Sequence, residues 1–279
     1  MVDKMRQLKV LFNIIWCLLI VTPVVQAAKL AVVIDDFGYR EHNEKQIIAL
    51  PYPITVAVLP NSPNGVSIAT LAHQHNKDVI IHLPMAPIGK QPLEIDTLFP
   101  SMTQSEIHRI ISQAVNKVPY AIGLNNHMGS LMTSDLAGMQ KVMNSLSDYS
   151  LFFLDSKTIA KSKAIEAAIE YRVPTVTRDV FLDDSQELSA VAHQFDLAVQ
   201  SARKHGSAVA IGHPYNSTVK VLQEKLPLLP DDIELVYVRY LVKEPQKIKL
   251  SELVEQYKIE AEQGIFEYMI ITESNKKPD

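Results

Sequence analysis

Carboxylate, imidazole and amide side chains recur at the ends of short apolar runs in this chain of 279 residues. In chain order they are Asp35 and Asp36, His82, Asn125, Asn126 and His127, Asp155, Arg178 and Asp179, and His213. Such groups can hold a metal ion, move a proton or hydrogen-bond a polar substrate. Taken singly, an Asp here is often a turn residue and a His is often hydrogen-bonded in a core. Their joint placement favours one shared site.

The apolar runs that precede these groups predict β-strands. We expect strands at residues 29–34, 54–59, 79–83, 121–124, 151–154, 175–180, 208–211 and 234–238. Several are unbroken β-branched runs, such as residues 31–34 and 79–81. Runs of this kind are typical of strands buried on both faces of a parallel sheet.

Amphipathic stretches between the runs predict helices, at residues 103–116, 135–147, 159–171, 187–204 and 216–225. Thr103 and Glu106 have the spacing of a capping box. Alternating strands and helices predict an α/β fold, either a barrel or a doubly wound sheet. The chain has no internal repeat and no linker, so we expect one domain. In a barrel the C-terminal strand ends meet at one face, which would bring the polar groups together.

The N-terminus has the pattern of a secretory signal peptide. Lys4, Arg6 and Lys9 precede an apolar stretch over residues 10–25, and small residues then lead to Ala27. We expect residues 1–27 to be removed. The alternative is a retained membrane anchor, for which an apolar run of about 16 residues is short. The single cysteine, Cys17, lies inside this segment, so the mature chain would contain no thiol or disulfide.

Composition and missing motifs exclude several classes of protein. Hydrophobic residues make up 47% and charged residues 21% of the chain, which excludes coiled coils, low-complexity disorder and multi-span membrane proteins. A net charge of -4 with no basic patch argues against a nucleic-acid partner. Neither a Gly-x-Gly-x-x-Gly motif nor a P-loop occurs, so we expect no nucleotide cofactor. The Gly-x-Ser-x-Gly elbow of serine hydrolases is also absent.

Five segments of the chain resemble a known family. Residues 34–38, Ile-Asp-Asp-Phe-Gly, resemble the Thr-Phe-Asp-Asp-Gly opening motif of the polysaccharide deacetylase superfamily. Residues 80–87, 123–130 and 153–156 are similar to motifs of its divergent branch, and residues 211–213 are similar to the closing Leu-x-His motif. The resemblance covers residues 29–242. It implies a distorted (β/α)₇ barrel at residues 28–245, followed by a C-terminal extension at residues 246–279, and one divalent metal ion, usually zinc.

The resemblance also implies roles for individual residues. Asp35 would be the general base, Asp36 a metal ligand and His213 the general acid. The family's second motif has a further histidine four residues after the first, but here His82 is followed by Ala86 at that distance. We expect His127 to take the place of the missing ligand.

The resulting metal set is Asp36, His82 and His127, which is a recognised combination for catalytic zinc. Phe37 and Gly38 are expected to turn the chain so that Asp35 and Asp36 reach the same point.

Further roles are expected from placement at strand ends. Asn125, Asn126 and Arg178 would bind sugar hydroxyls or an oxyanion. Asp155 or Asp179 would orient the imidazole of His213.

The sequence therefore predicts an exported, metal-dependent hydrolase that acts on a carbohydrate. The expected reaction is removal of N-acetyl groups from an envelope glycan, with the periplasm as the expected location. The alternative is a catalytically degenerate barrel that acts as a glycan-binding or regulatory envelope protein. The family's Arg-x-x-[Phe/Tyr]-Arg and Asp-x-x-Asp-Trp motifs are absent, which favours the alternative. The retained aspartate pair and closing histidine favour the enzyme.

Cleavage of the signal peptide gives the first testable prediction. The exported protein should begin at Ala28, because signal peptidase cuts after small residues such as Ala27. Mass spectrometry of the intact exported protein measures this directly. A mass that still includes Met1 would replace the cleaved signal with a membrane anchor.

Overall fold

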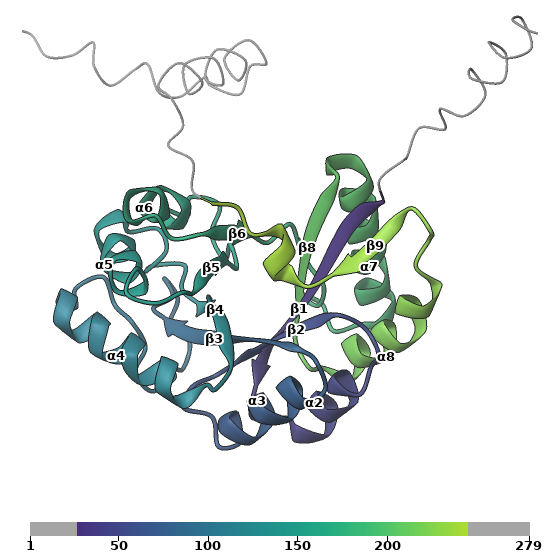
Figure 1. The fold of residues 1–279 in the computed structure, drawn as a ribbon, viewed down its shortest axis with the longest axis horizontal. Helices are drawn as coiled ribbons and strands as arrows, with labels where there is room; N and C mark the ends of the chain where they lie inside the picture. The colour runs from purple at the N-terminus through teal and green to yellow at the C-terminus, as the bar shows by residue number, and fades with distance from the viewer. Residues whose placement is uncertain (1–26, 245–279) are drawn as a thin grey trace, which may run out of the picture.

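The computed structural model describes residues 27–244, in which the apolar runs form one parallel sheet (Figure 1). The expected signal peptide and C-terminal extension lie almost wholly outside these residues. The strands are β1 (Ala28–Phe37), β2 (Ile54–Val58), β3 (Asp78–Met85), β4 (Ala121–Met128), β5 (Phe152–Asp155), β6 (Thr175–Thr177), β7 (Val180–Phe181), β8 (Ser207–Gly212) and β9 (Ile233–Val236). They are ordered β6-β5-β4-β3-β2-β1-β8-β7, and β9 pairs with the first residues of β1.

Helices alternate with the strands and lie around the outside of the curved sheet (Figure 1). They are α2 (Glu41–Ile48), α3 (Gly65–Gln74), α4 (Gln104–Lys117), α5 (Leu136–Leu146), α6 (Ala164–Tyr171), α7 (Leu188–His205) and α8 (Asn216–Lys225). Two short 3₁₀ helices follow, η1 (Leu226–Leu228) and η2 (Val238–Leu241). The sheet curls into an incomplete barrel, which confirms the predicted distorted (β/α)₇ architecture. Among the described residues, no helix is long and apolar enough to cross a membrane.

Several element boundaries differ from those expected. The capping box is confirmed, since Thr103 and Glu106 each bond the other's backbone at the start of α4. Helix α6 begins at Ala164, five residues later than expected. The strands β1, β3 and β4 continue past their apolar runs, because backbone pairing does not require apolar side chains. Asp35, His82 and residues 125–127 therefore lie inside strands, near their C-terminal ends.

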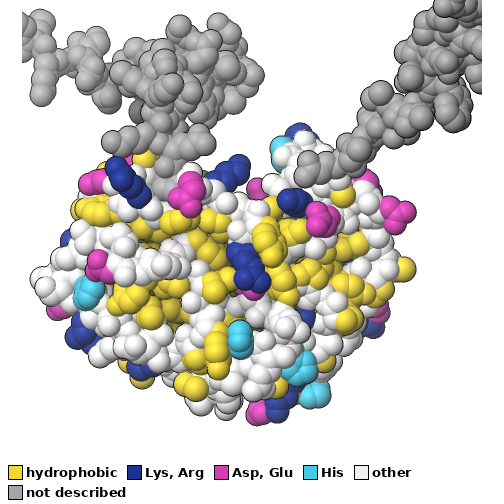
Figure 2. All heavy atoms as spheres, in the orientation of Figure 1, with side chains coloured by type: hydrophobic (Ala, Val, Ile, Leu, Met, Phe, Trp, Pro, Cys, Tyr) yellow, Lys and Arg dark blue, Asp and Glu magenta, His cyan; other side chains and the backbone are white. Residues whose placement is uncertain are grey.

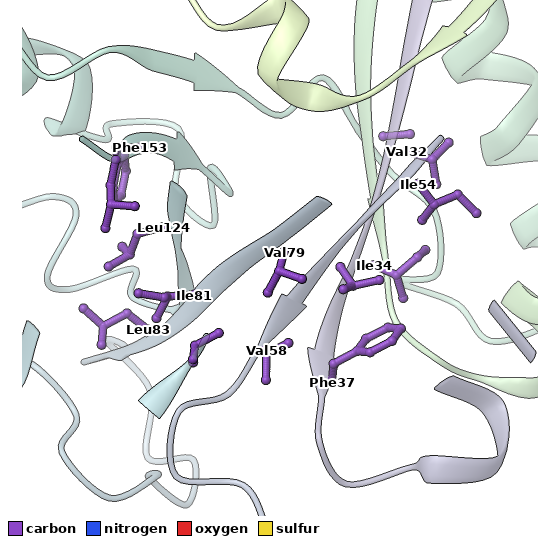
Figure 3. Close-up of a cluster of buried hydrophobic side chains, with 14 of the residues drawn as sticks. Val32, Ile34, Phe37, Ile54, Val58, Val79, Ile81, Leu83, Leu124 and Phe153 are labelled. Atoms are coloured by element: carbon purple, nitrogen blue, oxygen red, sulfur yellow. The ribbon is translucent and has the colours of Figure 1, made fainter. Parts of the chain in front are cut away.

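Side chains of the strands alternate between two cores. Val32 and Ile34 of β1 join the large cluster between the sheet and the helices, part of which Figure 3 shows. Ala31 and Val33 join a smaller cluster inside the barrel. The period of two along a strand predicts that Asp35 also points into the barrel. The same alternation places His82, Asn125 and His213 on the inner side, since Ile80 and Ile211 belong to the inner cluster.

A segment around η2 crosses the barrel mouth opposite the C-terminal strand ends. Backbone N–H of Val238 donates to Thr55 of β2, and Lys243 pairs with Thr175 of β6. Figure 2 shows hydrophobic side chains gathered on the face that η2 crosses. Arg239 extends from this segment to Asp78 at the start of β3, with 2.8 Å between Nη2 and Oδ1. The second oxygen of the Asp78 carboxylate is buried without a hydrogen-bond partner.

Asp78 should therefore make stability depend on pH. Burial raises its pKa to about 6, and Arg239 only partly offsets this. The folded protein then binds the proton more tightly than the unfolded chain, so this carboxyl lowers the free energy of unfolding as pH rises through about 4 to 6. We expect Asp78→Asn to gain on the order of 1 kcal/mol relative to the parent between pH 4 and pH 7, as measured by urea unfolding. Asp148→Asn, at an exposed carboxylate, is the control; an Asp78→Asn difference that does not change with pH would contradict this account.

Candidate active site and metal centre

Asp35 and Asp36 both reach the imidazole of His82, although they are neighbours in one strand. The distances from His82 Nε2 are 3.7 Å to Asp35 Oδ2 and 3.2 Å to Asp36 Oδ1. Asp36 has φ of 57°, and the pairing of β1 with β2 shifts register between Ile34 and Phe37. This is a β-bulge, in which an extra residue interrupts the alternation. Gly38 has the expected positive φ, of 117°, but the residue that brings the two carboxylates together is Asp36 itself.

Two histidines from neighbouring strands complete a cluster around Asp36. His82 lies on β3 and His127 on β4, which pair in parallel. His127 Nδ1 is 3.0 Å from Asp36 Oδ1 and 3.1 Å from His82 Nε2. The three atoms form a nearly equilateral triangle with sides of 3.0 to 3.2 Å. His82 is 2% exposed, whereas Asp36 and His127 are partly open to solvent.

The cluster fits a divalent metal ion. Ligands about 2.1 Å from zinc at tetrahedral angles lie roughly 3.4 Å apart, close to the observed spacing. Asp36 Oδ1 is buried yet has no hydrogen bond of acceptable geometry, so it is free to accept another partner. Burial would raise the pKa of Asp36, but the imidazoles of His127 and His82 hold it well below its usual range. A carboxylate and two imidazoles that converge in this way form a possible metal site.

Ala86 stands where the family's second motif has a histidine, and its backbone connects two loops. Its backbone carbonyl accepts hydrogen bonds from the N–H groups of Leu131 and Met132, and its own N–H donates to Leu98. The residue is fully buried. It joins the loops that follow β3 and β4, and the imidazole that completes the triangle comes from His127 on the adjacent strand.

His213 lies on the other side of Asp36 from the triangle's histidines, in a network of its own. Its Nε2 is 3.8 Å from Asp36 Oδ2, and its Nδ1 is 2.9 Å from Asp183 Oδ1. Asp183 Oδ2 accepts from the backbone N–H of His213 and from the hydroxyl of Thr218. Burial favours the neutral imidazole, but Asp183 and Asp36 outweigh it and raise the pKa of His213 to about 9. His213 is therefore protonated at neutral pH.

Asn125 connects Asp35 with His82 inside the barrel. Its Oδ1 is 2.7 Å from His82 Nδ1, and its Nδ2 is 2.9 Å from Asp35 Oδ1. Burial raises the pKa of Asp35, against the opposing effects of His82, His213 and this hydrogen bond.

Asn126 and Arg178 stabilise the neighbouring loops. The amide of Asn126 bonds the backbone of Met128 and Ser156. The guanidinium of Arg178 donates to the carbonyls of Ser156 and Lys157.

The expectation that Asp155 or Asp179 orients His213 is wrong. Asp155 shares the outer side of β5 with Phe153, and its carboxylate accepts from the N–H of Lys157. Asp179 bonds the backbone N–H of Val209 and is exposed.

The error arose from the single strand predicted at residues 175–180, which is in fact two strands, β6 and β7. Asp179 therefore precedes β7, and the carboxylate that follows β7 is Asp183. The sequence does contain a signal for Asp183. If residues 180–182 are taken as a separate apolar run, Asp183 directly follows a strand, as the other candidate residues do.

Residues 32–242 match the divergent polysaccharide deacetylase family. The chain belongs to this family. The match covers the whole sheet except the first residues of β1, and it includes Asp35, Asp36, His82, His127, Asp183 and His213 of the candidate site.

Individual relatives agree with this assignment. The uncharacterized protein YibQ of Escherichia coli strain K12 is 56% identical over 82% of this chain and 72% of its own. The uncharacterized protein ATU2773 of Agrobacterium tumefaciens has a similar crystal structure, with a TM-score of 0.72 at 20% identity over 78% of this chain and 90% of its own. A mutant of BA3943, described as a CE4 family pseudoenzyme with restored enzymatic activity, has a TM-score of 0.50 at 12% identity over 77% of this chain and 67% of its own. The two structural likenesses support the fold.

Metal content tests the triangle directly. Ala substitution of Asp36, His82 or His127 should lower the affinity for Zn²⁺ by at least about tenfold, since even outer partners of ligands contribute about 10–100-fold. His213→Ala should retain the ion, because His213 is not part of the triangle. Titration with Zn²⁺ and elemental analysis after dialysis measure both, with melting temperatures to confirm folding. Full occupancy in His127→Ala together with loss in His213→Ala would show that the ligand set is wrong.

Proposed function

We propose that this protein is an exported, metal-dependent hydrolase that removes N-acetyl groups from an envelope glycan. The observation that carries the proposal is the position of two proton-transfer groups beside the candidate metal site. Asp35 is within 3.7 Å of His82, and His213 is within 3.8 Å of Asp36. A protein that only binds a glycan has no use for this combination.

A divalent ion held by Asp36, His82 and His127, which we take to be Zn²⁺, would polarise the amide carbonyl and lower the pKa of a water molecule. Asp35 would take the proton of the attacking water, whose oxygen forms the new bond to the carbonyl carbon. Burial strengthens Asp35 as a base, because it raises the pKa of this carboxyl. Asp35 lies beside the metal triangle without being part of it, since its Oδ2 is 3.7 Å from His82 Nε2 and its Oδ1 is bonded to Asn125.

His213 would donate the proton that the nitrogen needs as the C–N bond breaks. A protonated imidazole is required at the start; burial opposes it, but the Asp183 carboxylate bonded to Nδ1 favours it and raises the pKa of His213. Asp183 fixes which nitrogen faces the substrate, because it binds Nδ1 and leaves Nε2 turned towards Asp36. The products would be acetate and a free amine.

Separate observations support the proposed carbohydrate substrate and the proposed location in the periplasm. Family membership supports a carbohydrate, and a net charge of -4 fits a neutral glycan better than a polyanion. The pattern of residues 1–27 supports export, and the similarity to an Escherichia coli protein supports the periplasm as the destination. Arg178 is the proposed contact to sugar hydroxyls, through donor groups that its backbone bonds leave available. Asn125 and Asn126, expected in the same role, are buried and bonded within the protein.

Asp35 and Asp36 should differ in the effect of the same substitution. Asp35→Asn should keep the metal ion but lose about 10²–10⁴-fold in deacetylation, because an amide cannot accept the proton of water. Asp36→Asn should weaken the binding of the ion itself. Release of acetate and of free amine from N-acetylated glycan fragments, measured beside zinc content, separates the two effects.

The matched control is Asp148→Asn, which removes an exposed carboxylate just after the end of α5 and should leave both measurements unchanged. Full activity in Asp35→Asn would remove Asp35 from the mechanism. A protein that binds zinc and glycan fragments but releases no acetate would instead be the glycan-binding member of the family.

A further inference from the structure

One buried amide touches both the proposed base and a proposed metal ligand. Asn125 has no solvent exposure, and its two polar atoms bond His82 Nδ1 at 2.7 Å and Asp35 Oδ1 at 2.9 Å. Its Nδ2 also lies 3.2 Å from the hydroxyl of Ser156. Asn125 and His82 face one another because β3 and β4 pair directly at these two residues.

The chemistry of the partners fixes the orientation of this amide. The carboxylate of Asp35 can only accept when ionised, so it requires the NH₂ group of Asn125. The carbonyl oxygen of Asn125 must then face His82, whose Nδ1 has to carry a proton to donate to it. The reversed amide would place its oxygen against a carboxylate and its NH₂ group against the N–H of the imidazole. Only one arrangement satisfies both partners.

We propose that Asn125 is a positioning residue that sets the tautomer of His82 and fixes the orientation of the Asp35 carboxylate relative to that imidazole. In the neutral imidazole that a metal ion binds, a proton on Nδ1 leaves the lone pair of His82 on Nε2, the atom that faces Asp36 and His127. The same amide keeps Asp35 Oδ1 bonded and leaves Asp35 Oδ2 directed at the metal triangle. The neutral amide does this without adding charge to the cluster. The inference rests on the proposed function only for the role of Asp35; the tautomer of His82 depends on the amide alone.

Asn126 shows that the role is specific to one of the two adjacent amides. Its side chain hydrogen-bonds the backbone of Met128 and Ser156, and neither of these bonds involves His82 or Asp35. Asn126 therefore shapes the loops after β4 and β5, whereas Asn125 joins two reactive side chains.

Two substitutions at Asn125 separate its two bonds. Asn125→Ala removes both and should lower Zn²⁺ affinity by about 10–100-fold, the usual effect of losing the outer partner of a histidine ligand. Asn125→Asp keeps an acceptor for His82 but places a second carboxyl group against Asp35, so the two groups must share one proton. Because the bond to His82 remains, we expect its Zn²⁺ affinity to stay within a few-fold of the parent and above that of Asn125→Ala. Asn144→Asp adds the same charge on the exposed surface of α5 and is the control.

A spectroscopic readout tests the tautomer without metal or turnover. In protein with ¹⁵N-labelled histidine, the Nδ1 proton of His82 should give a slowly exchanging, downfield signal in the parent and in Asn125→Asp. The signal should be lost in Asn125→Ala. Equal loss of Zn²⁺ affinity in both variants, or an unchanged signal in Asn125→Ala, would overturn the proposal. A parent protein that binds no Zn²⁺ but shows this pattern of signals would contradict the proposed function and leave the role of Asn125 in place.

Discussion

The left-handed backbone of Asp36, with φ of 57°, places the carboxylates of two consecutive residues in one cluster. Without the bulge, Asp35 would face the barrel and Asp36 would face the helices, where Phe37 now packs in the outer core. A non-glycine residue in this region costs about 1–3 kcal/mol, and Asp is among the types that tolerate it best. Strands β2 and β8 pair with β1 on its two edges and hold the strained residue in place. His82, His127 and His213 belong to one site because the carboxylate of Asp36 lies within 3.8 Å of all three imidazoles.

In this site a metal ligand keeps its type and its place in the cluster although it comes from a different position in the sequence. The second imidazole comes from β4 instead of from the loop after β3, and paired parallel strands make this exchange possible because their ends lie side by side. Ala86 has become a point where two loops attach. The side chain of Ala86 is fully buried, so an imidazole at that position would need the surrounding core to make room for it. In this chain the second imidazole comes from His127 on the adjacent strand.

Sequence patterns predicted the alternating strands and helices and most of the cluster, and the family resemblance favoured the barrel over the doubly wound sheet. Apolar β-branched runs gave the parallel strands, and strand-end polarity gave Asp35, Asp36, His82, His127 and His213. Helix α2 was missed because only three of its eight residues are buried and its sequence is mostly polar. Asp183 was missed because residues 175–181 look like one strand, and the break at Arg178 and Asp179 depends on which partners the two halves find, β5 for β6 and β8 for β7. The bulge at Asp36 could not be read from the pattern, since Gly38 offers the same turn at less cost to the backbone.

The central position of β1 has a consequence for how the chain folds. This strand comes first in the domain, yet two of its three partners, β8 and β9, come last. Pairs so far apart in sequence give a high contact order and slow folding, because loop closure must precede the contacts that stabilise it. During synthesis, the apolar residues 30–34 would stay uncovered on one edge until almost the whole domain had emerged. The strand that carries both carboxylates is thus also one whose apolar residues wait for late partners while the chain is incomplete, a situation that favours aggregation.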